Sequence, residues 1–149
     1  VAKGLHNLAL LRQRVEIRTV LLQQNYERLP QLAEFIYRNF PFAAHIALMG
    51  METTGMAWKH IEQVWIDPVE YAAPLREAVR TLHQRDLNVS IYNLPLCLLP
   101  SELWNFSRDS ISDWKKTYMP VCRECSVQSK CPGVFATSEH KSPNIKPIS

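Results

Sequence analysis

The chain alternates short runs of apolar, often β-branched residues with longer segments whose apolar residues recur at helical spacing. The apolar runs cover residues 15–22, 43–49 and 87–92, and we expect each to form a strand. Buried strands that alternate with amphipathic helices are typical of a parallel sheet, because parallel neighbours need a crossover between them. The sequence therefore predicts an α/β fold whose three strands belong to a larger sheet or a partial barrel.

The segments between these runs carry the helical patterns. We expect the helix over residues 67–85 to begin at Asp67, with Asp67 as N-cap and Pro68 as the first helical residue. The helix over residues 29–40 has apolar residues at 3.6-residue spacing and is expected to end at Pro41. The predicted helices are residues 1–12, 29–40, a short piece within 58–65, and 67–85.

Composition excludes several other classes of protein. Hydrophobic residues make up 46% and charged residues 21% of the 149, which is normal for a folded domain. No apolar run reaches the ~18 residues of a membrane-spanning helix, so we expect no membrane partner. The first residues lack the apolar core of a secretory leader, which favours the cytoplasm. The chain starts without Met in helical sequence, so we expect a fragment of a longer protein.

Charge is spread unevenly along the chain. Residues 1–114 hold 11 Lys and Arg against 12 Asp and Glu, a net charge of −1. Residues 115–149 hold 6 against 2, a net charge of +4. This mildly basic end suits an anionic group, such as a thiolate-ligated cluster or an acidic peptide. It is too sparse for nucleic-acid binding, which needs a dense basic face with aromatic residues, so no nucleic-acid partner is expected.

Three of the four cysteines fall within ten residues, in the pattern Cys122-x2-Cys125-x5-Cys131. Without a secretion signal, clustered thiols indicate metal or cluster ligands more than disulfides. Cys97, 25 residues upstream, is the candidate fourth ligand, and His140 is a weaker one. Four thiolates suit zinc or an iron–sulfur cluster, and the uneven spacing favours the cluster. Buried free thiols are the alternative, above all for Cys97 between leucines.

The order of several segments, joined to the cysteine spacing, resembles the C-terminal half of radical S-adenosylmethionine (SAM) enzymes. The resemblance is strongest to the His-Xaa-Ser system radical SAM maturases. No single segment is diagnostic, but together they span nearly the whole chain. The matching segments are residues 4–8, 15–18, 47–52, 65–68, 90–93, 110–115 and the cysteine block 122–135.

The resemblance implies a fold and a function. Such families have a partial (β/α) barrel, and an N-terminal CxxxCxxC loop holds a [4Fe–4S] cluster that binds SAM. The radical formed from SAM abstracts hydrogen from a peptide or protein substrate. This sequence contains no CxxxCxxC, so we expect no radical chemistry from it alone. Its partners would be the missing N-terminal half of the same enzyme, or companion maturation proteins.

The resemblance also implies cofactor contacts at strand ends. Arg18 would pair with the SAM carboxylate, and Gly50 would let the backbone approach the adenine ring. Met49 would supply an apolar contact, and Glu52 would meet the ribose hydroxyls or the substrate. Each residue has an ordinary alternative: an ion pair between Arg18 and Glu16, core packing for Met49, and a solvated loop carboxylate for Glu52. No catalytic residue is assigned.

We therefore expect three regions: residues 1–95 as the C-terminal half of the barrel, 96–137 as a cysteine-rich, mostly irregular metal-binding extension, and 138–149 as a flexible tail. One short helix is expected over residues 112–118. The leading function is a fragment of a radical SAM peptide maturase with an auxiliary [4Fe–4S] cluster at Cys97, Cys122, Cys125 and Cys131. The alternative is a zinc-stapled structural or binding module. A Ser or Cys hydrolase is disfavoured, because no nucleophile motif is present.

Overall fold

The computed structural model describes residues 1–109 and 113–149. Its centre is a parallel sheet of four strands in the order β1-β2-β3-β4. The three expected strands are confirmed and the chain is an α/β protein. β4 has two residues, too few for a sequence pattern, and was not predicted. The strands are β1 (Glu16–Val20), β2 (His45–Met49), β3 (Val89–Tyr92) and β4 (Ser107–Arg108).

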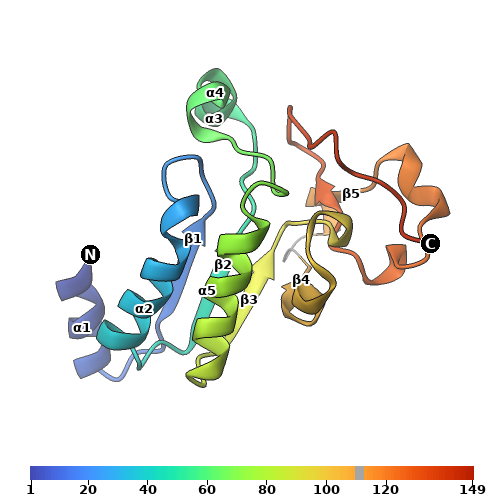
Figure 1. Ribbon diagram of the computed structural model, residues 1–149. Helices are drawn as coiled ribbons and strands as arrows, with labels where there is room; N and C mark the ends of the chain where they lie inside the picture. The colour runs from blue at the N-terminus through green and yellow to red at the C-terminus, as the bar shows by residue number, and fades with distance from the viewer. Residues whose placement is uncertain (110–112) are drawn as a thin grey trace.

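Two long helices cover one face of this sheet (Figure 1). They are α2 (Leu29–Asn39), which connects β1 to β2, and α5 (Ala72–Gln84), which precedes β3. Their inner faces and the strands form one core, in which Ile46, Leu75 and Ile91 are fully buried. Shorter helices are α1 (Ala2–Leu10), η1 (Tyr26–Arg28), α3 (Gly55–Lys59) and α4 (Ile61–Val64).

The N-terminal helix α1 contributes little to that core. Leu5 packs against it, but Leu8 and Leu11, predicted on the same helical face, are 42% and 69% exposed. The apolar pattern of residues 1–12 therefore forms a helix as expected, while most of its apolar side chains stay in contact with solvent.

The predicted start of the helix over residues 67–85 is wrong: α5 begins at Ala72, and residues 68–71 form a turn. The reason lies in Asp67, whose Oδ1 accepts a hydrogen bond from the Val69 N–H at 3.1 Å. The Glu70 N–H bonds to the Asp67 carbonyl at 2.9 Å, which closes the turn. Pro74 sits in the first turn of α5, where a missing N–H costs nothing.

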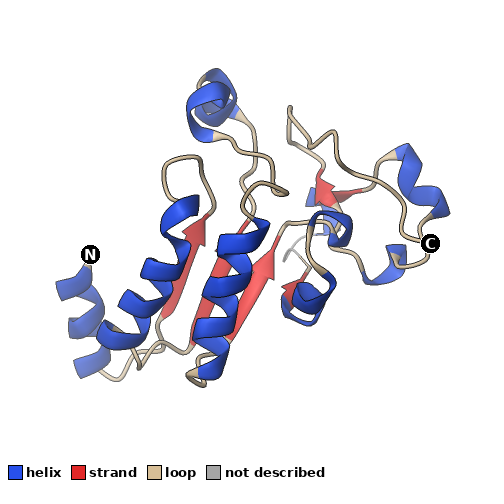
Figure 2. Cartoon of the chain, in the orientation of Figure 1, coloured by secondary structure: helices blue, strands red, loops and turns tan. Residues whose placement is uncertain are grey.

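Short 3-10 turns and short strands make up the chain after β3 (Figure 2). The helix expected over residues 112–118 is wrong. Ser112 lies outside the described residues, a single 3-10 turn follows, and β5 then pairs with β6 in an antiparallel sheet. The elements are η2 (Leu96–Leu98), η3 (Ser101–Phe106), η4 (Asp113–Lys115), β5 (Lys116–Thr117), η5 (Pro120–Glu124), η6 (Gln128–Lys130) and β6 (Val134–Phe135).

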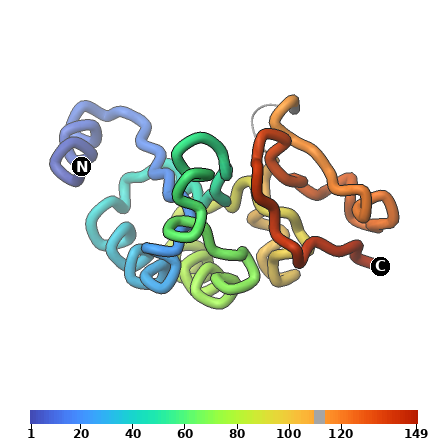
Figure 3. Tube along the Cα trace, turned by 90° about the horizontal axis from the view of Figure 1, so that it is seen from above, coloured from blue at the N-terminus to red at the C-terminus, as the bar shows by residue number. Residues whose placement is uncertain are grey.

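Residues 138–149, here named the C-terminal strap, have no helix or strand. Seen from above, the strap runs between the α3–α4 region and the cysteine-rich extension (Figure 3). Hydrogen bonds join it to both parts: Ser138 and His140 bond to Thr53, and the Ile148 carbonyl accepts from Ser126.

Within the described residues, the helices are all too short or too polar to cross a membrane.

Candidate functional site

All four cysteines line one pocket, although they lie as far as 34 residues apart in sequence. Cys97 comes from η2, directly after the carboxyl end of β3, and Cys122 comes from η5. Cys125 follows η5, and Cys131, which is 8% exposed, follows η6. The fold therefore brings together the cysteine set predicted from the sequence. Apolar side chains complete the pocket, including Leu96, Met119, Val127, Val134, Ile145 and Ile148.

Backbone N–H groups point at the sulfur atoms of this pocket. The N–H groups of Leu96 and Gly133 each donate to Cys131 Sγ at 3.4 Å. The Ile148 N–H donates to Cys125 Sγ at 3.5 Å. A thiol is a weak acceptor, whereas a thiolate ligand is stabilised by such bonds, which also set the potential of iron–sulfur centres. These donors would stabilise the sulfurs of Cys125 and Cys131 as thiolates if a metal or cluster bound there.

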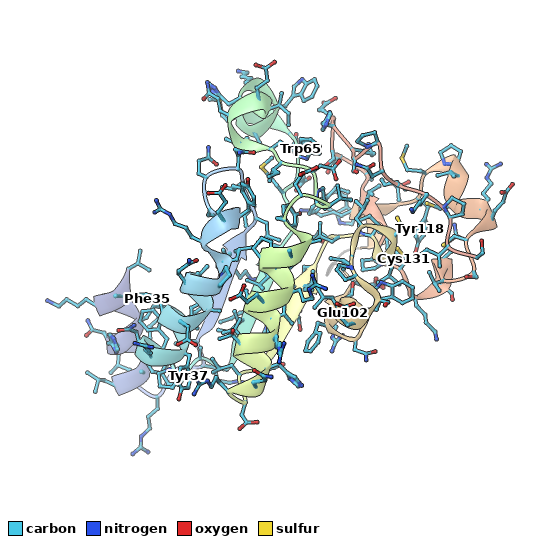
Figure 4. The ribbon with its side chains drawn as sticks, in the orientation of Figure 1. Phe35, Tyr37, Trp65, Glu102, Tyr118 and Cys131 are labelled. Atoms are coloured by element: carbon cyan, nitrogen blue, oxygen red, sulfur yellow. The ribbon has the colours of Figure 1, made fainter. Side chains whose placement is uncertain are left out.

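The loop that carries three of the cysteines is closed at its base by the β5–β6 pair, in which Thr117 faces Val134. The Tyr118 hydroxyl donates to the Cys131 carbonyl at 2.8 Å, and both residues lie in the C-terminal part of the molecule (Figure 4). Gly133 has φ +68°, and a Cβ there would lie 2.5 Å from the Thr117 carbonyl oxygen. Only glycine fits this position without moving the backbone.

Burial is the main influence on two of the thiols. It raises the pKa of Cys97, opposed in part by a backbone hydrogen bond from Lys146. It also raises the pKa of Cys131, opposed in part by the N–H groups of Leu96 and Gly133. These two sulfurs are therefore protonated at neutral pH unless a cation binds, and binding a metal would release their protons.

Four thiols could hold one of two centres, a single zinc ion or an iron–sulfur cluster. Across residues 1–109 and 113–149, no three His, Cys, Asp or Glu side chains converge closely enough to hold one metal ion. Zinc draws its thiolates to ~2.3 Å from one centre, whereas each thiolate of a [4Fe–4S] cluster binds a different iron.

Arg18 lies at the centre of β1 and forms an ion pair with Glu16, the alternative given by the sequence. Glu16 also accepts from His45 Nδ1 at 2.9 Å, and His45 Nε2 lies 3.0 Å from Ser90 Oγ. Both ring nitrogens of His45 therefore have partners. Together, Arg18, Glu16, His45 and Ser90 form a row of polar side chains across β1, β2 and β3. This row is distant in sequence from the cysteines.

The other three predicted cofactor residues lie at the carboxyl end of β2. Met49 is half-buried and pairs with Tyr92 in the sheet register. The open side of Gly50 is filled by this chain, since a Cβ there would lie 2.6 Å from Leu94 Cδ2. Glu52 contacts the Thr137 hydroxyl and lies 4.0 Å from Lys115 Nζ, so it joins the sheet edge to the extension.

A second pocket of about 490 Å³ lies beside the first and shares Pro95, Val134 and Ile145 with it. Trp65 and Tyr71 line one side, and residues of the strap line the other. Sequence reasoning missed this pocket, because its two sides are about 70 residues apart in the chain. The strap, which lines one side of this pocket, is polar and contains two prolines. This composition predicted a flexible tail and gave no indication that the strap packs against the sheet edge.

Comparison of the chain with protein-family models, with curated proteins and with solved structures finds no match.

Proposed function

We propose that this chain is the C-terminal part of a radical SAM enzyme that modifies a peptide, and that its four cysteines hold an auxiliary [4Fe–4S] cluster. The observation that carries the proposal is the convergence of Cys97, Cys122, Cys125 and Cys131 on one apolar pocket with N–H groups directed at sulfur. Such a cluster supplies electron transfer or a binding point for substrate when it is present.

The position of the pocket supports the same proposal. It begins at Cys97, just beyond the carboxyl end of β3, and ligand sites of parallel α/β sheets lie at that edge. In this proposal the four strands are part of a (β/α) barrel whose remaining strands and SAM-binding cluster come from an N-terminal half. The resemblance to the His-Xaa-Ser system maturases is the argument for a peptide substrate and for a cytoplasmic location.

This chain's own residues have defined tasks in the proposal. The backbone amides of Leu96, Gly133 and Ile148 stabilise the thiolates, and the apolar wall keeps water from the cluster. Met49 and Glu52, at the carboxyl end of β2, face the region where SAM is expected. Arg18 stands two strand residues before that edge and is engaged with Glu16, which makes it the weakest of the SAM contacts.

Metal analysis of anaerobically purified protein tests the proposal. We expect about four iron and four sulfide per chain for one [4Fe–4S] cluster, whereas zinc without sulfide would establish the alternative, a zinc-stapled module. Ser substitution at each of the four cysteines should reduce bound metal. Ser129→Ala, an exposed position in the same loop, is the matched control. If Cys97→Ser leaves metal content unchanged, Cys97 is not the fourth ligand.

A further inference from the structure

The C-terminal strap contacts two separate parts of the molecule, and its last residues form one wall of the cysteine pocket. Ile145, Lys146 and Ile148 line that pocket together with the four cysteines. Seen from above, the strap reaches this position from the α3–α4 region (Figure 3). It thus covers a site whose other walls come from residues 95–134.

Backbone N–H groups of the strap are directed at two of the four sulfurs. The Ile148 N–H donates to Cys125 Sγ at 3.5 Å. Burial raises the pKa of Cys97, and a hydrogen bond from the Lys146 backbone opposes that rise. The cysteine loop also holds the strap, since the N–H and the hydroxyl of Ser126 donate to the Ile148 carbonyl at 2.9 Å and 2.8 Å. The strap therefore lies against the thiols without being a ligand itself.

An anchor outside the pocket, Thr53, fixes the other end of the strap. Its Oγ1 donates to the His140 carbonyl at 2.8 Å and accepts from the His140 N–H at 2.9 Å. The Thr53 N–H donates to Ser138 Oγ at 3.0 Å, and the Thr53 carbonyl accepts from the Glu139 N–H at 3.0 Å. Thr53 is 1% exposed, so water does not compete for these bonds.

Side-chain contacts of the next strap residues extend this anchor. The rings of Trp65 and His140 meet edge to face, with centroids 4.3 Å apart, and Trp65 lies beside α4 (Figure 4). Ser142 Oγ donates to Asp67 Oδ2 at 2.7 Å, and Asn144 Nδ2 donates to the same oxygen at 3.2 Å. Residues 138–144 are thus fixed at a place where they do not line the cysteine pocket.

Two prolines stiffen the link between the anchor and the pocket wall. Pro143 and Pro147 hold their own φ at about −65°, and each favours extended backbone at the residue before it. Pro147 stands between the two donors, Lys146 and Ile148. Because a short, stiff segment absorbs little displacement, the register set at Thr53 also sets where the two donors lie.

We propose that the strap is a lid on the cysteine pocket, and that Thr53, which does not line the pocket, is the positioning residue that holds the lid closed. Metal leaves the pocket, and solutes reach the thiols, when the strap lifts off Thr53 and Asp67. The inference rests on the proposed function for the metal in the pocket. It applies to zinc as it does to a cluster, because the same thiolates would hold either.

The rate of metal loss from the full chain tests the lid. The chain is loaded with Zn²⁺ or, anaerobically, with ferrous iron and sulfide, and excess EDTA is then added. Thr53→Val removes the hydroxyl at nearly constant volume. We expect this variant to lose metal about tenfold faster, because breaking two buried hydrogen bonds raises the population of the lifted strap. Thr53→Ser keeps the hydroxyl and should lose metal at close to the rate of the unchanged chain.

A second variant weakens the anchor from the strap and leaves Thr53 in place. Ser142→Ala removes the bond to Asp67 and the acceptor of the Asn144 N–H, so it should also lose metal faster. Glu139→Ala is the matched control and should not change the rate, because the exposed Glu139 side chain makes no hydrogen bond in the described part of the chain. Circular dichroism confirms that each variant is folded.

Equal rates of metal loss for the unchanged chain, Thr53→Val and Ser142→Ala would overturn the proposal. So would loss from Thr53→Ser as fast as from Thr53→Val, since the hydroxyl would then not be the anchor.

A chain that takes up neither metal contradicts the proposed function but not the lid. Alkylation of Cys97 and Cys125 by iodoacetamide in the metal-free chain then decides. Thr53→Val and Ser142→Ala should be alkylated about tenfold faster at these two cysteines than the unchanged chain. Equal alkylation rates would overturn the lid.

Discussion

At the scale of single residues, Gly133 links backbone conformation to the cysteine pocket. Its N–H donates to Cys131 Sγ, and its positive φ turns the chain into β6. We expect Gly133→Ala to lower the free energy of unfolding by about 1–3 kcal/mol, because the new Cβ is strained and meets the Thr117 carbonyl. Gly4→Ala is the control: Gly4 lies in α1 with open space around it, so alanine should be neutral or stabilise by roughly 0.5–1 kcal/mol. Urea unfolding of both variants measures the two changes in the free energy of unfolding.

The ionisation of Glu16, on the surface of the sheet, makes the stability of the fold depend on pH. The hydrogen bond from His45, then that from Arg18, lowers the pKa of Glu16 below its usual 4.5. A lowered pKa stabilises the fold above the unfolded value and loses this stabilisation as pH falls through the folded value. We therefore expect Glu16→Gln to destabilise the protein at pH 6 and to have progressively less effect below about pH 4.5. Denaturation at several pH values measures this.

A matched variant is Glu62→Gln, because Glu62 is exposed in α4 and has no ion pair in the described part of the chain. If both variants show the same pH profile, the polar row from Arg18 to Ser90 does not contribute to stability.

At the scale of elements, the sheet and the two helices α2 and α5 carry the stability of the N-terminal part. Leu75 is 0% exposed at the centre of α5, and Leu75→Ala should cost about 2–5 kcal/mol through lost burial and a cavity. Leu10→Ala in α1, where the side chain is 82% exposed, should change stability by less than about 0.5 kcal/mol. Thermal or urea unfolding separates the two. Equal effects would show that Leu10 is buried in solution, which would contradict its exposed position in α1.

The cysteine-rich extension has a different basis for its stability. Leu96, Leu98, Leu99 and Leu103 are buried, but the elements after Leu103 are 3-10 turns and two-residue strands. We expect that later part to bury too little apolar surface to offset an ordering entropy of roughly 1–2 kcal/mol per residue. A closed thiolate site can supply on the order of ten kcal/mol. Limited proteolysis after chelation should therefore cut between Ser101 and Lys130, and metal loading should suppress those cuts. Equal resistance in both states would show that Leu103 and Trp104, which pack on the core, hold the extension without metal.

Pattern and topology explain which elements the sequence could predict. Strands β1 to β3 and helix α2 follow from local periodicity, since most of their apolar residues face one core. The start of α5 was mispredicted, because Asp67 closes a turn and bonds to the strap instead of capping the helix. The strand β5 was mispredicted as helix, because its partner β6 lies 17 residues further along the chain.

At the scale of the whole molecule, the four cysteines were predictable as a set from spacing, whereas the contacts of the C-terminal strap were not. The contacts of Thr53 and Asp67 with the strap join residues 75 to 87 apart, such as Thr53 with Ser138 and Asp67 with Ser142, and no local pattern encodes them. The expected role of Gly50, a close approach of the backbone to the adenine ring, is not supported either. The carbonyl of Asn93 and the side chain of Leu94 fill the space that a bound ring would need.

The isolated chain should bind SAM weakly or not at all. It contains no CxxxCxxC, so the metal chelate that would hold the amino and carboxylate groups is missing. Each ~1.4 kcal/mol lost weakens binding tenfold, and a bidentate chelate contributes several times that. Isothermal titration calorimetry should find no micromolar binding, and a micromolar dissociation constant would contradict this.

The strap has a consequence for the order in which the molecule is made. Every strand of the parallel sheet is complete once residue 108 has been synthesised, so the sheet can form while the rest of the chain is still emerging. Thr53, buried at 1% exposure in the finished fold, must wait for Ser138 and His140 before its hydrogen bonds exist. During that interval the carboxyl edge of the sheet is open to the surroundings, and it closes only after residues 138–140 have been synthesised.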